Sequence, residues 1–284
     1  MKRSLRVAIR YGAYPVVAGG TLLTLLGLAG AGVGYWPMFP LLSLGGLLAV
    51  LALERLQPFE AAWQADHGGD TRVDLLHLLV SQVLIQTAVA LAFGARAALP
   101  GLPRLWPDQA PMAVQILLAG LVMDAGLYAM HRLSHTQGWL WRLHALHHGP
   151  RRLYGLNSGR RHPLSALALA LPGLTLLMGL GVTPIALGAW LAFMSVHLAF
   201  QHANLDYRLG PMRRWLAVAE MHRWHHRRDH REAQVNYGEV FLFWDALFGT
   251  RHLPPAEPAR FAVGLDEASP PEAYLAQLRW PFRT

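Results

Sequence analysis

The chain has 284 residues, of which 53% are hydrophobic and only 15% are charged, and its mean hydropathy is +0.25. Soluble domains carry about 25% charged residues, so we expect much of this surface to face lipid rather than water. The formal charge of +8 is spread over short basic clusters between apolar stretches, which argues against nucleic-acid binding, and zero cysteines exclude disulfides, thiolate metal sites and iron–sulfur clusters.

Apolar stretches long enough to cross a bilayer begin close to the N-terminus. The first runs from about residue 14 to 36 and is too long for the core of a signal peptide, although basic residues precede it. The second, residues 38–53, follows after a short turn. We therefore predict that this pair forms a transmembrane hairpin, followed by a polar segment.

Further apolar regions follow that polar segment. The third span covers residues 75–99 and the fourth residues 112–131, with prolines between them. The last region, residues 163–200, contains two glycines and a proline near its middle and is long enough for two helices of about 18 residues. A hairpin fits this region, and so does a re-entrant or partly inserted segment. The sequence thus predicts an all-α fold of polytopic transmembrane helices.

Lysine and arginine counts predict the orientation. The N-terminal segment holds four, residues 131–162 hold six, and the tail after residue 202 holds eleven. An even number of crossings between these basic segments places all three on one side of the membrane. The positive-inside rule makes that side the cytoplasm, so every histidine cluster is expected to face the same compartment.

Most of the fifteen histidines fall into short patterns. HRLSH and HLAFQH each contain two histidines, and HALHH and HRWHH each contain an HxxHH triplet. On a helix, positions i, i+3 and i+4 share one face, so each triplet is expected to aim three imidazoles in one direction. Composition alone would give about 0.04 such triplets in a chain of this length. Unpartnered imidazoles near a membrane boundary are costly, and metal coordination supplies the partners.

The number of imidazoles indicates more than one metal ion. Eight to ten candidate ligands exceed the three or four that one tetrahedral zinc uses, and they suit two ions with open positions. Imidazole binds Zn, Cu, Fe and Ni, so the ligand type alone does not name the metal. A redox reaction beside lipid favours iron, because zinc does not activate dioxygen.

The motifs also stand in a characteristic order: HRLSH, HALHH, RRHP, FQHANL, HRWHH, NYG and WDALFGT. Over about residues 124–250 this order resembles the fatty acid hydroxylase / sterol desaturase superfamily. The resemblance implies a centre of two Fe ions that uses O2 and two external electrons to hydroxylate, or desaturate, an unactivated C–H of a lipid. Residues 1–110 would then be N-terminal transmembrane helices. Residues 111–284 would be the fatty acid hydroxylase-like catalytic region of the same membrane domain, with the site in a cytoplasmic helical cap.

The resemblance also implies the metal ligands. The histidines of the three boxes are the main candidates, and two histidines of the intervening segment join them with less regular spacing: His131, His135, His144, His147, His148, His197, His202, His222, His225 and His226. His162 precedes a proline in a motif that the family often shares, and its role stays open. The other histidines, at 67, 77, 230 and 252, are expected to be surface, loop or packed residues.

Two polar residues outside the boxes are candidates for a supporting role. Asp124 lies seven residues before His131 in an apolar helix, so it could orient that imidazole, or it could serve a helix-to-helix hydrogen bond instead. Asn236 of the NYG motif could touch the site, and it fits a turn or cap equally well.

Two rival functions use the same imidazoles. A metal-binding transporter would hold its ligands within the spans near the midplane, whereas these boxes lie at span ends. A zinc-dependent membrane hydrolase would need a general-base glutamate, and neither HxxHH box contains one.

The resemblance implies two partners. One is a lipid (fatty acyl, sterol or other isoprenoid) within the membrane. The other is a separate electron-donor protein, because no cytochrome-like HPGG segment is present.

Overall fold

The computed structural model of the protein describes residues 2–66, 68–255, 260–265 and 269–283. Within these ranges the regular structure is helical, and three isolated β-bridges take the place of a sheet. The predicted all-α fold is therefore confirmed.

Six helical segments are long and apolar enough to cross a membrane. The first is continuous from Arg3 to Gly30 and combines α1 (Arg3–Tyr14), a π-helical turn (Pro15–Gly19) and α2 (Gly20–Gly30). The others are α3 (Met38–Leu56), α4 (Asp70–Ala97), α5 (Met112–Thr136), α7 (Pro163–Leu180) and α8 (Pro184–His202). The multi-pass prediction is confirmed, and several helices extend beyond their apolar stretch because the polar residues at their ends continue the helical hydrogen bonds.

The last apolar region forms a helical hairpin, one of the two arrangements that its length allowed. Gly181 ends α7 with a φ of 83°, a left-handed conformation that glycine adopts without steric cost. Pro184 then starts α8, since its missing N–H is not needed in the first turn of a helix.

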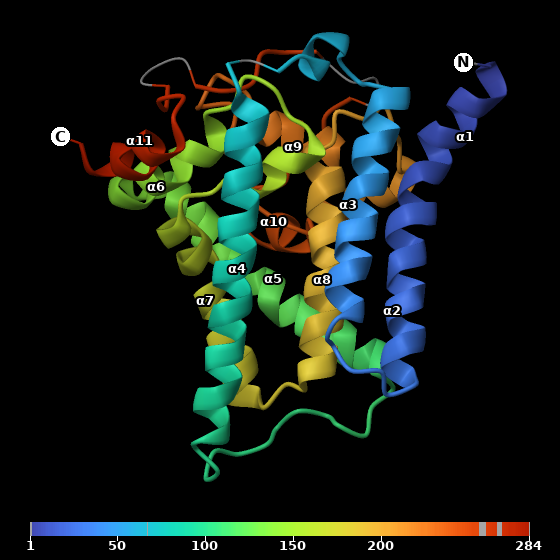
Figure 1. Ribbon diagram of the computed structural model, residues 1–284, viewed down its shortest axis with the longest axis vertical. Coiled ribbons are helices and arrows are strands. Elements are labelled where there is room, and N and C mark those ends of the chain that lie inside the picture. The colour runs from blue at the N-terminus through green and yellow to red at the C-terminus, as the bar shows by residue number, and fades with distance from the viewer. Residues whose placement is uncertain (1, 67, 256–259, 266–268, 284) are drawn as a thin grey trace.

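The remaining helices gather at one end of the bundle, near both termini (Figure 1). They are α6 (Gly138–His148), α9 (Ala219–His225), α10 (Phe243–Leu247), α11 (Tyr274–Arg279) and several short 3-10 turns. We call this part of the molecule the cap. It joins the cap-side ends of α5 and α8, where the histidine boxes begin.

Ion pairs and hydrogen bonds fasten the loop after α6 to the spans. Arg152 binds Asp70 at 2.6 and 2.8 Å, and Arg160 binds Asp74 at 2.9 Å, both at the start of α4. Glu54 at the end of α3 accepts the Gly155 N–H at 2.7 Å. These contacts involve buried or half-buried groups, so the 3-10 turn Gly155–Gly159 is held in one place beside α3 and α4.

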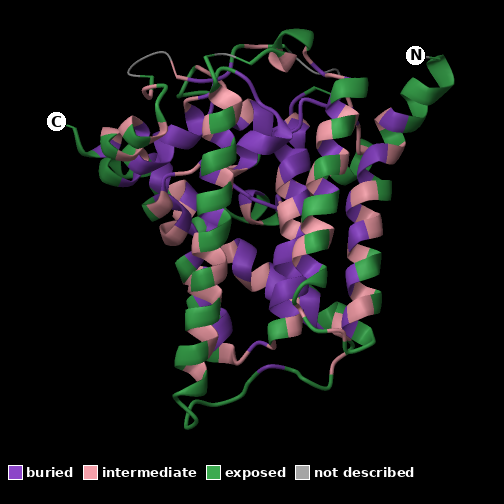
Figure 2. Cartoon of the chain, viewed as in Figure 1, coloured by how far each residue is buried: buried purple, intermediate pink, exposed green. Residues whose placement is uncertain are grey.

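The buried residues concentrate around α5 and α8, whereas exposed and half-buried residues predominate along α4 and α2 (Figure 2). The most apolar window of α8 is 72% buried and that of α4 only 11%. Exposed leucines such as Leu79, Leu91 and Leu23 lie on these outer helices. We conclude that α8 and α5 form the centre of the bundle and that the outer faces contact lipid.

The helices α5 and α7 approach each other through glycine. A Cβ added at Gly126 would lie 2.4 Å from the Gly173 nitrogen and 2.8 Å from its Cα, which are backbone atoms that have no room to move. Small residues permit such close backbone packing in membrane helices. The close approach fixes the position of α5, which carries His131 and His135.

We expect Gly126→Ala to destabilise the protein by about 1–3 kcal/mol, because the added methyl group overpacks the α5–α7 contact. The readout is the melting temperature in mild detergent, which should fall by several degrees. Gly94→Ala on α4 is the matched control, since nothing lies within 4 Å of a Cβ at that position. Equal melting temperatures for both variants would show that the α5–α7 contact does not limit stability.

Candidate metal centre

Nine buried histidines from four parts of the chain meet at the cap end of the bundle. They come from α5, α6, the end of α8 and the segment of α9. Their ring nitrogens form two groups, and within each group the candidate ligand atoms lie within 4.8 Å of one another. Group one contains His131, His135, His144, His148 and His225, and group two contains His147, His202, His222 and His226.

Each HxxHH triplet contributes to both groups. His144 and His148 belong to group one and His147 to group two, while His222 and His226 belong to group two and His225 to group one. The expectation that a triplet aims three imidazoles in one direction is therefore wrong. Successive helical residues are about 100° apart, so i and i+4 point within about 40° of each other while i+3 lies about 60° to the other side of i. The HxxHH spacing thus links two neighbouring sites.

The ring nitrogens within the groups lie at distances that suit ligands of one ion. The Nε2–Nε2 distances are 3.0 Å for His131–His225, 2.9 Å for His202–His222 and 3.0 Å for His222–His226. Two nitrogens bound to one ion at about 2.0–2.1 Å lie roughly 3 Å apart at a right angle and roughly 3.4 Å apart at a tetrahedral angle. The observed Nε2–Nε2 separations match the distances expected for two nitrogens bound to one ion.

The hydrogen-bond partners of the two Nδ1 atoms show that the contact between His131 and His225 is not an ordinary hydrogen bond. His131 Nδ1 lies 2.7 Å from the Tyr237 carbonyl oxygen, and His225 Nδ1 lies 2.8 Å from the Val235 carbonyl oxygen. A carbonyl only accepts, so each Nδ1 carries the proton of its neutral ring. Both Nε2 atoms then present lone pairs to each other at 3.0 Å. Two lone pairs repel at this distance, and a bound cation removes the repulsion.

Group two shows the same arrangement. His202 Nδ1 donates to Asn157 Oδ1 at 3.0 Å, and His147 Nδ1 donates to the Arg160 carbonyl at 3.2 Å. The amide of Asn157 is fixed in turn, because its Nδ2 donates to the Arg152 carbonyl. Partners of this kind set the tautomer and orientation of metal-binding imidazoles. The fastened loop after α6 therefore orients two rings of group two.

Several ring nitrogens have no hydrogen-bond partner among the described residues although they are buried. They include His135 Nε2 in group one and His147 Nε2 in group two. A buried polar atom without a partner is costly. These atoms and the opposed lone pairs indicate that each group can bind a metal ion through its imidazole nitrogens. Imidazole nitrogen suits Zn, Cu, Fe and Ni.

Burial also keeps the cap histidines in the form that binds metal. Burial lowers the pKa of the rings in the two triplets well below the usual value, and neighbouring imidazoles lower it further: His144, His147, His148, His222, His225 and His226. These rings are therefore neutral at pH 7. A neutral imidazole offers a lone pair to a metal ion without first losing a proton.

The structure adds a buried ion pair that the sequence did not single out. Arg161 Nη2 donates to both carboxylate oxygens of Glu239 at 2.9 and 3.0 Å, and Glu239 Oε1 lies 3.8 Å from His131 Nδ1. Both Glu239 and His131 are 1% exposed. The signal in the sequence was a single carboxylate directly after the NYG motif, within an otherwise apolar run.

The two supporting candidates have structural contacts instead. Asp124 accepts the backbone N–H groups of Val240 and Phe241 at 2.8 and 3.1 Å, so it fixes the segment after NYG and does not orient His131. Asn236 has a φ of 56° and exchanges hydrogen bonds with the backbone of His252 at 2.8 and 2.9 Å, as a turn residue does. Both act on the site only through the chain segment that carries Tyr237.

His197 lies outside both groups. Its Nδ1 is 2.6 Å from the Tyr14 hydroxyl, which links α8 to the first span. The expectation that His197 is a ligand is therefore not supported by its position, because the helix points it away from the α9 histidines that His202 meets, five residues later.

The remaining histidines have other roles. His162 caps α7 through the Leu164 N–H and contacts the Leu278 carbonyl, and His77 binds Gln277 and the Arg161 carbonyl. His252 packs on Trp224, and His230 lies beside His135 at the edge of group one. His67 lies outside the described residues.

Comparison with known proteins gives a consistent set of relatives. A family model described as fatty acid hydroxylase matches residues 116–250. An ornithine lipid hydroxylase of Rhizobium tropici is 37% identical over 245 residues, which cover 83% of this chain and 73% of the relative. Methylsterol monooxygenase 2-2 of Arabidopsis thaliana is 28% identical and covers 63% of this chain and 67% of its own length. Human alkylglycerol monooxygenase is 29% identical over 139 residues, which cover 46% of this chain and 29% of the relative. No solved structure matches the chain.

Removal of one ligand from either group should lower the metal content of the protein. We expect His225→Ala and His222→Ala each to lose about one ion per chain, because each variant takes a nitrogen from one group. Metal analysis by mass spectrometry after purification in mild detergent measures this loss. His252→Ala is the control, since that ring lies outside both groups. Wild-type metal content in both ligand variants would contradict the assignment of the groups.

Proposed function

The chain belongs to the fatty acid hydroxylase family, and from this membership we propose that it is a membrane-bound di-iron lipid hydroxylase. The observation that carries the proposal is the pair of adjacent imidazole groups, joined through two HxxHH triplets. Five and four imidazoles would hold two metal ions side by side. Iron bound there would supply redox chemistry with dioxygen, which zinc does not have.

The proposed reaction inserts one oxygen atom of O2 into a C–H bond: R–H + O2 + 2e⁻ + 2H⁺ → R–OH + H2O. The two iron ions, when bound, supply the activation of dioxygen for this reaction. The protein holds the ions through imidazole, excludes bulk water by burial of all nine rings, and orients the lipid. We infer hydroxylation rather than desaturation, and a separate protein supplies the two electrons.

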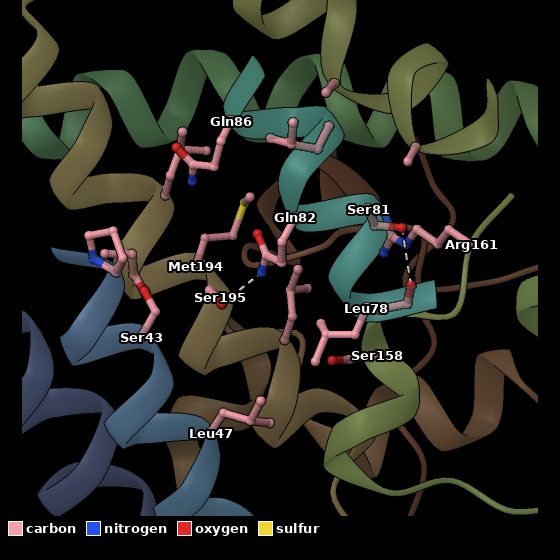
Figure 3. A pocket seen from close by; sticks show the side chains of 18 of the residues that line it. Ser43, Leu47, Leu78, Ser81, Gln82, Gln86, Ser158, Arg161, Met194 and Ser195 are labelled. Atoms are coloured by element: carbon pink, nitrogen blue, oxygen red, sulfur yellow. Dashed lines mark hydrogen bonds between the residues drawn. The ribbon is translucent and has the colours of Figure 1, made fainter. Parts of the chain in front are cut away.

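An apolar cavity of about 340 Å³ provides a place for the lipid (Figure 3). It lies between α3, α4, α5, α7 and α8, and its walls include Leu47, Leu78 and Leu127. Pockets for small ligands generally measure about 300–1,000 Å³ and have mostly apolar walls with a few polar groups. A hydrocarbon chain from the membrane fits such a cavity.

At its cap end the cavity is separated from the metal groups by the ion pair of Arg161 and Glu239. Arg161 lines the cavity and binds Glu239, which lies beside His131. Leu127, one helical turn before His131 on α5, also lines the wall. At the other end, Tyr35 donates to Gln86 at 2.7 Å. A lipid chain in this cavity would therefore run from the far side of the membrane toward the metal groups.

The polar side chains in the cavity are also oriented toward one another. Gln82 donates to Ser195 at 3.5 Å, from α4 to α8, and Ser81 donates to the Gly159 carbonyl at 3.3 Å (Figure 3). These two hydrogen bonds link α4 to α8 and to the 3-10 turn Gly155–Gly159. The relatives act, by their names, on ornithine lipid, alkylglycerol and methylsterol. We propose a membrane lipid with an alkyl or acyl chain as the substrate.

We also propose how the chain is organised in the membrane. The N-terminal region 1–110 supplies two walls of the cavity and the carboxylates that bind Arg152 and Arg160, so it forms one integrated domain with the catalytic region 111–284. Both chain ends and the cap lie at the same end of the bundle (Figure 1). The abundance of arginine there supports a cytoplasmic position for the metal site.

The rival functions fit the site less well. The imidazole groups lie at the cap ends of α5 and α8, not midway along a span where a transporter binds its cargo. A zinc hydrolase needs a glutamate beside the metal-bound water. Glu220, just before the second triplet, binds Arg213 at 3.0 Å, and both carboxylate oxygens of Glu239 accept from Arg161 at 2.9 and 3.0 Å, so each carboxylate is already engaged by an arginine.

Protein purified in mild detergent from cells grown on iron-57 should contain about two irons per chain, with a Mössbauer signal of coupled iron. Cells that produce it should accumulate a hydroxylated lipid that cells with His144→Ala lack, because that variant removes a group-one ligand. Lipid profiling by mass spectrometry identifies the product. Stoichiometric zinc, with no consumption of O2 after reduction, would overturn the proposal.

A bulky side chain in the cavity should block the lipid without disturbing the metal. Ser195→Trp is expected to lower product formation at least tenfold and to retain the wild-type iron content, because Ser195 lines the cavity from α8 and contacts no ring of either group. Leu176→Trp on the exposed face of α7 is the control and should retain activity. Full activity of Ser195→Trp would show that the lipid lies elsewhere.

A further inference from the structure

A second, larger cavity of about 800 Å³ opens on the cap. It lies between α6, the segment 228–231 that follows the second HxxHH triplet, and the C-terminal residues around Trp280. None of its lining residues belongs to one of the six membrane-spanning segments. The cavity is therefore separate from the lipid cavity, which the spans enclose.

This cap cavity is strongly basic. Among the described residues that line it there is one carboxylate, Asp229, and there are four arginines: Arg142, Arg228, Arg231 and Arg283. Arg142, Arg231 and Arg283 are exposed on the described surface. Clustered charge of one sign attracts partners of the opposite sign and steers their approach. The cavity thus fits a surface that carries carboxylates.

Aromatic rings connect the cap cavity to group one. Trp141 forms part of the cavity wall, and its ring centroid lies 5.1 Å from that of His135 and 5.4 Å from that of His148. His230, also in the wall, stacks on His135 with an interplanar angle of 10° and lies 4.4 Å from Trp141. A molecule in the cavity is therefore separated from the metal ligands by one layer of aromatic rings.

We propose that the cap cavity is the docking site for an acidic one-electron carrier protein, with Trp141 and His230 between the carrier and His135. The inference rests on the proposed function, in which each turnover consumes two electrons. The carrier is oxidised by one electron in each of two successive encounters, and the iron centre gains those two electrons. Repeated encounters require a small, charge-steered interface that dissociates quickly, which agrees with an exposed basic rim.

A lipid head group is the other acidic species available near a membrane. The cap cavity has no wall from a span, whereas the apolar cavity is lined by the spans and ends at Arg161, whose partner Glu239 lies 3.8 Å from His131. The two cavities approach group one from different sides: the lipid cavity approaches His131 through Glu239, and the cap cavity approaches His135 and His148 through Trp141. This separation favours the carrier over the lipid.

The test uses the complete protein in lipid nanodiscs and a plant-type [2Fe–2S] ferredoxin as the acidic carrier. Arg142→Glu combined with Arg231→Glu should weaken binding of the oxidised ferredoxin at least tenfold at low ionic strength, in iron-free and iron-loaded protein alike. The matched control, Arg214→Glu with Arg251→Glu, makes the same change in net charge outside the cavity and should alter binding less than twofold. Added salt should reduce the difference between the two pairs.

Stopped-flow reduction by ferredoxin provides the second readout. The cavity pair should slow it at least tenfold, while dithionite should reduce the iron of all variants equally and support one turnover of lipid. Trp141→Leu should slow electron transfer at least tenfold even at saturating ferredoxin, where a change in affinity no longer affects the rate. Equal effects of both arginine pairs, or no effect of the cavity pair, would overturn the docking site.

Two further outcomes separate the proposals. If the cavity pair changed product formation with dithionite and left ferredoxin binding intact, the cavity would serve the lipid and the docking proposal would fall. Failure of the wild-type protein to form product with dithionite would overturn the hydroxylase proposal, whereas loss of ferredoxin binding in the cavity pair would still support the docking site.

Discussion

Nine neutral imidazoles are buried at one end of a membrane bundle with several lone pairs facing one another, and the rest of the structure depends on how this unfavourable arrangement is stabilised. His131 and His225 show it most directly, since both protonate Nδ1 and oppose bare Nε2 atoms at 3.0 Å. Positive charge between the rings removes the repulsion. Without it, the chain would bury these Nε2 atoms at high cost, with no hydrogen bond to either of them.

The sequence predicted the parts of this arrangement that depend on local spacing. The spans followed from hydropathy, and the box histidines followed from i, i+3 and i+4 periodicity and the order of motifs. The HxxHH spacing separates the i+3 ring from the other two rings, but which histidines share a group also depended on the relative placement of α5, α6, α8 and α9, which no local pattern contains. Asp124 shows the same limit. Its spacing from His131 was correct for one helical face, but the backbone amides of Val240 and Phe241, far away in sequence, required an acceptor.

The supporting contacts explain why long stretches outside the boxes matter for the site. Asn157 orients His202, and its own position depends on the loop that Asp70 and Asp74 of α4 hold through Arg152 and Arg160. The N-terminal spans thus contribute no imidazole to either group yet fix the second group in place. In the sequence these early spans were recognisable only as apolar stretches. Their role became visible only through contacts between residues about 80 positions apart.

The two cavities separate the binding of the lipid from the supply of electrons, as the chemistry requires. A lipid hydroxylase needs an apolar substrate and a polar source of electrons at the same ions, and one surface would serve both poorly. The chain separates them by burial: α3, α4, α5, α7 and α8 enclose an apolar space that ends at Arg161 and Glu239, while α6 and the C-terminal segment form a basic space that ends at Trp141. The lipid cavity approaches His131 through Glu239 and the cap cavity approaches His135 through Trp141, and both histidines belong to α5. The α5–α7 glycine contact that fixes this helix therefore fixes the geometry of both approaches.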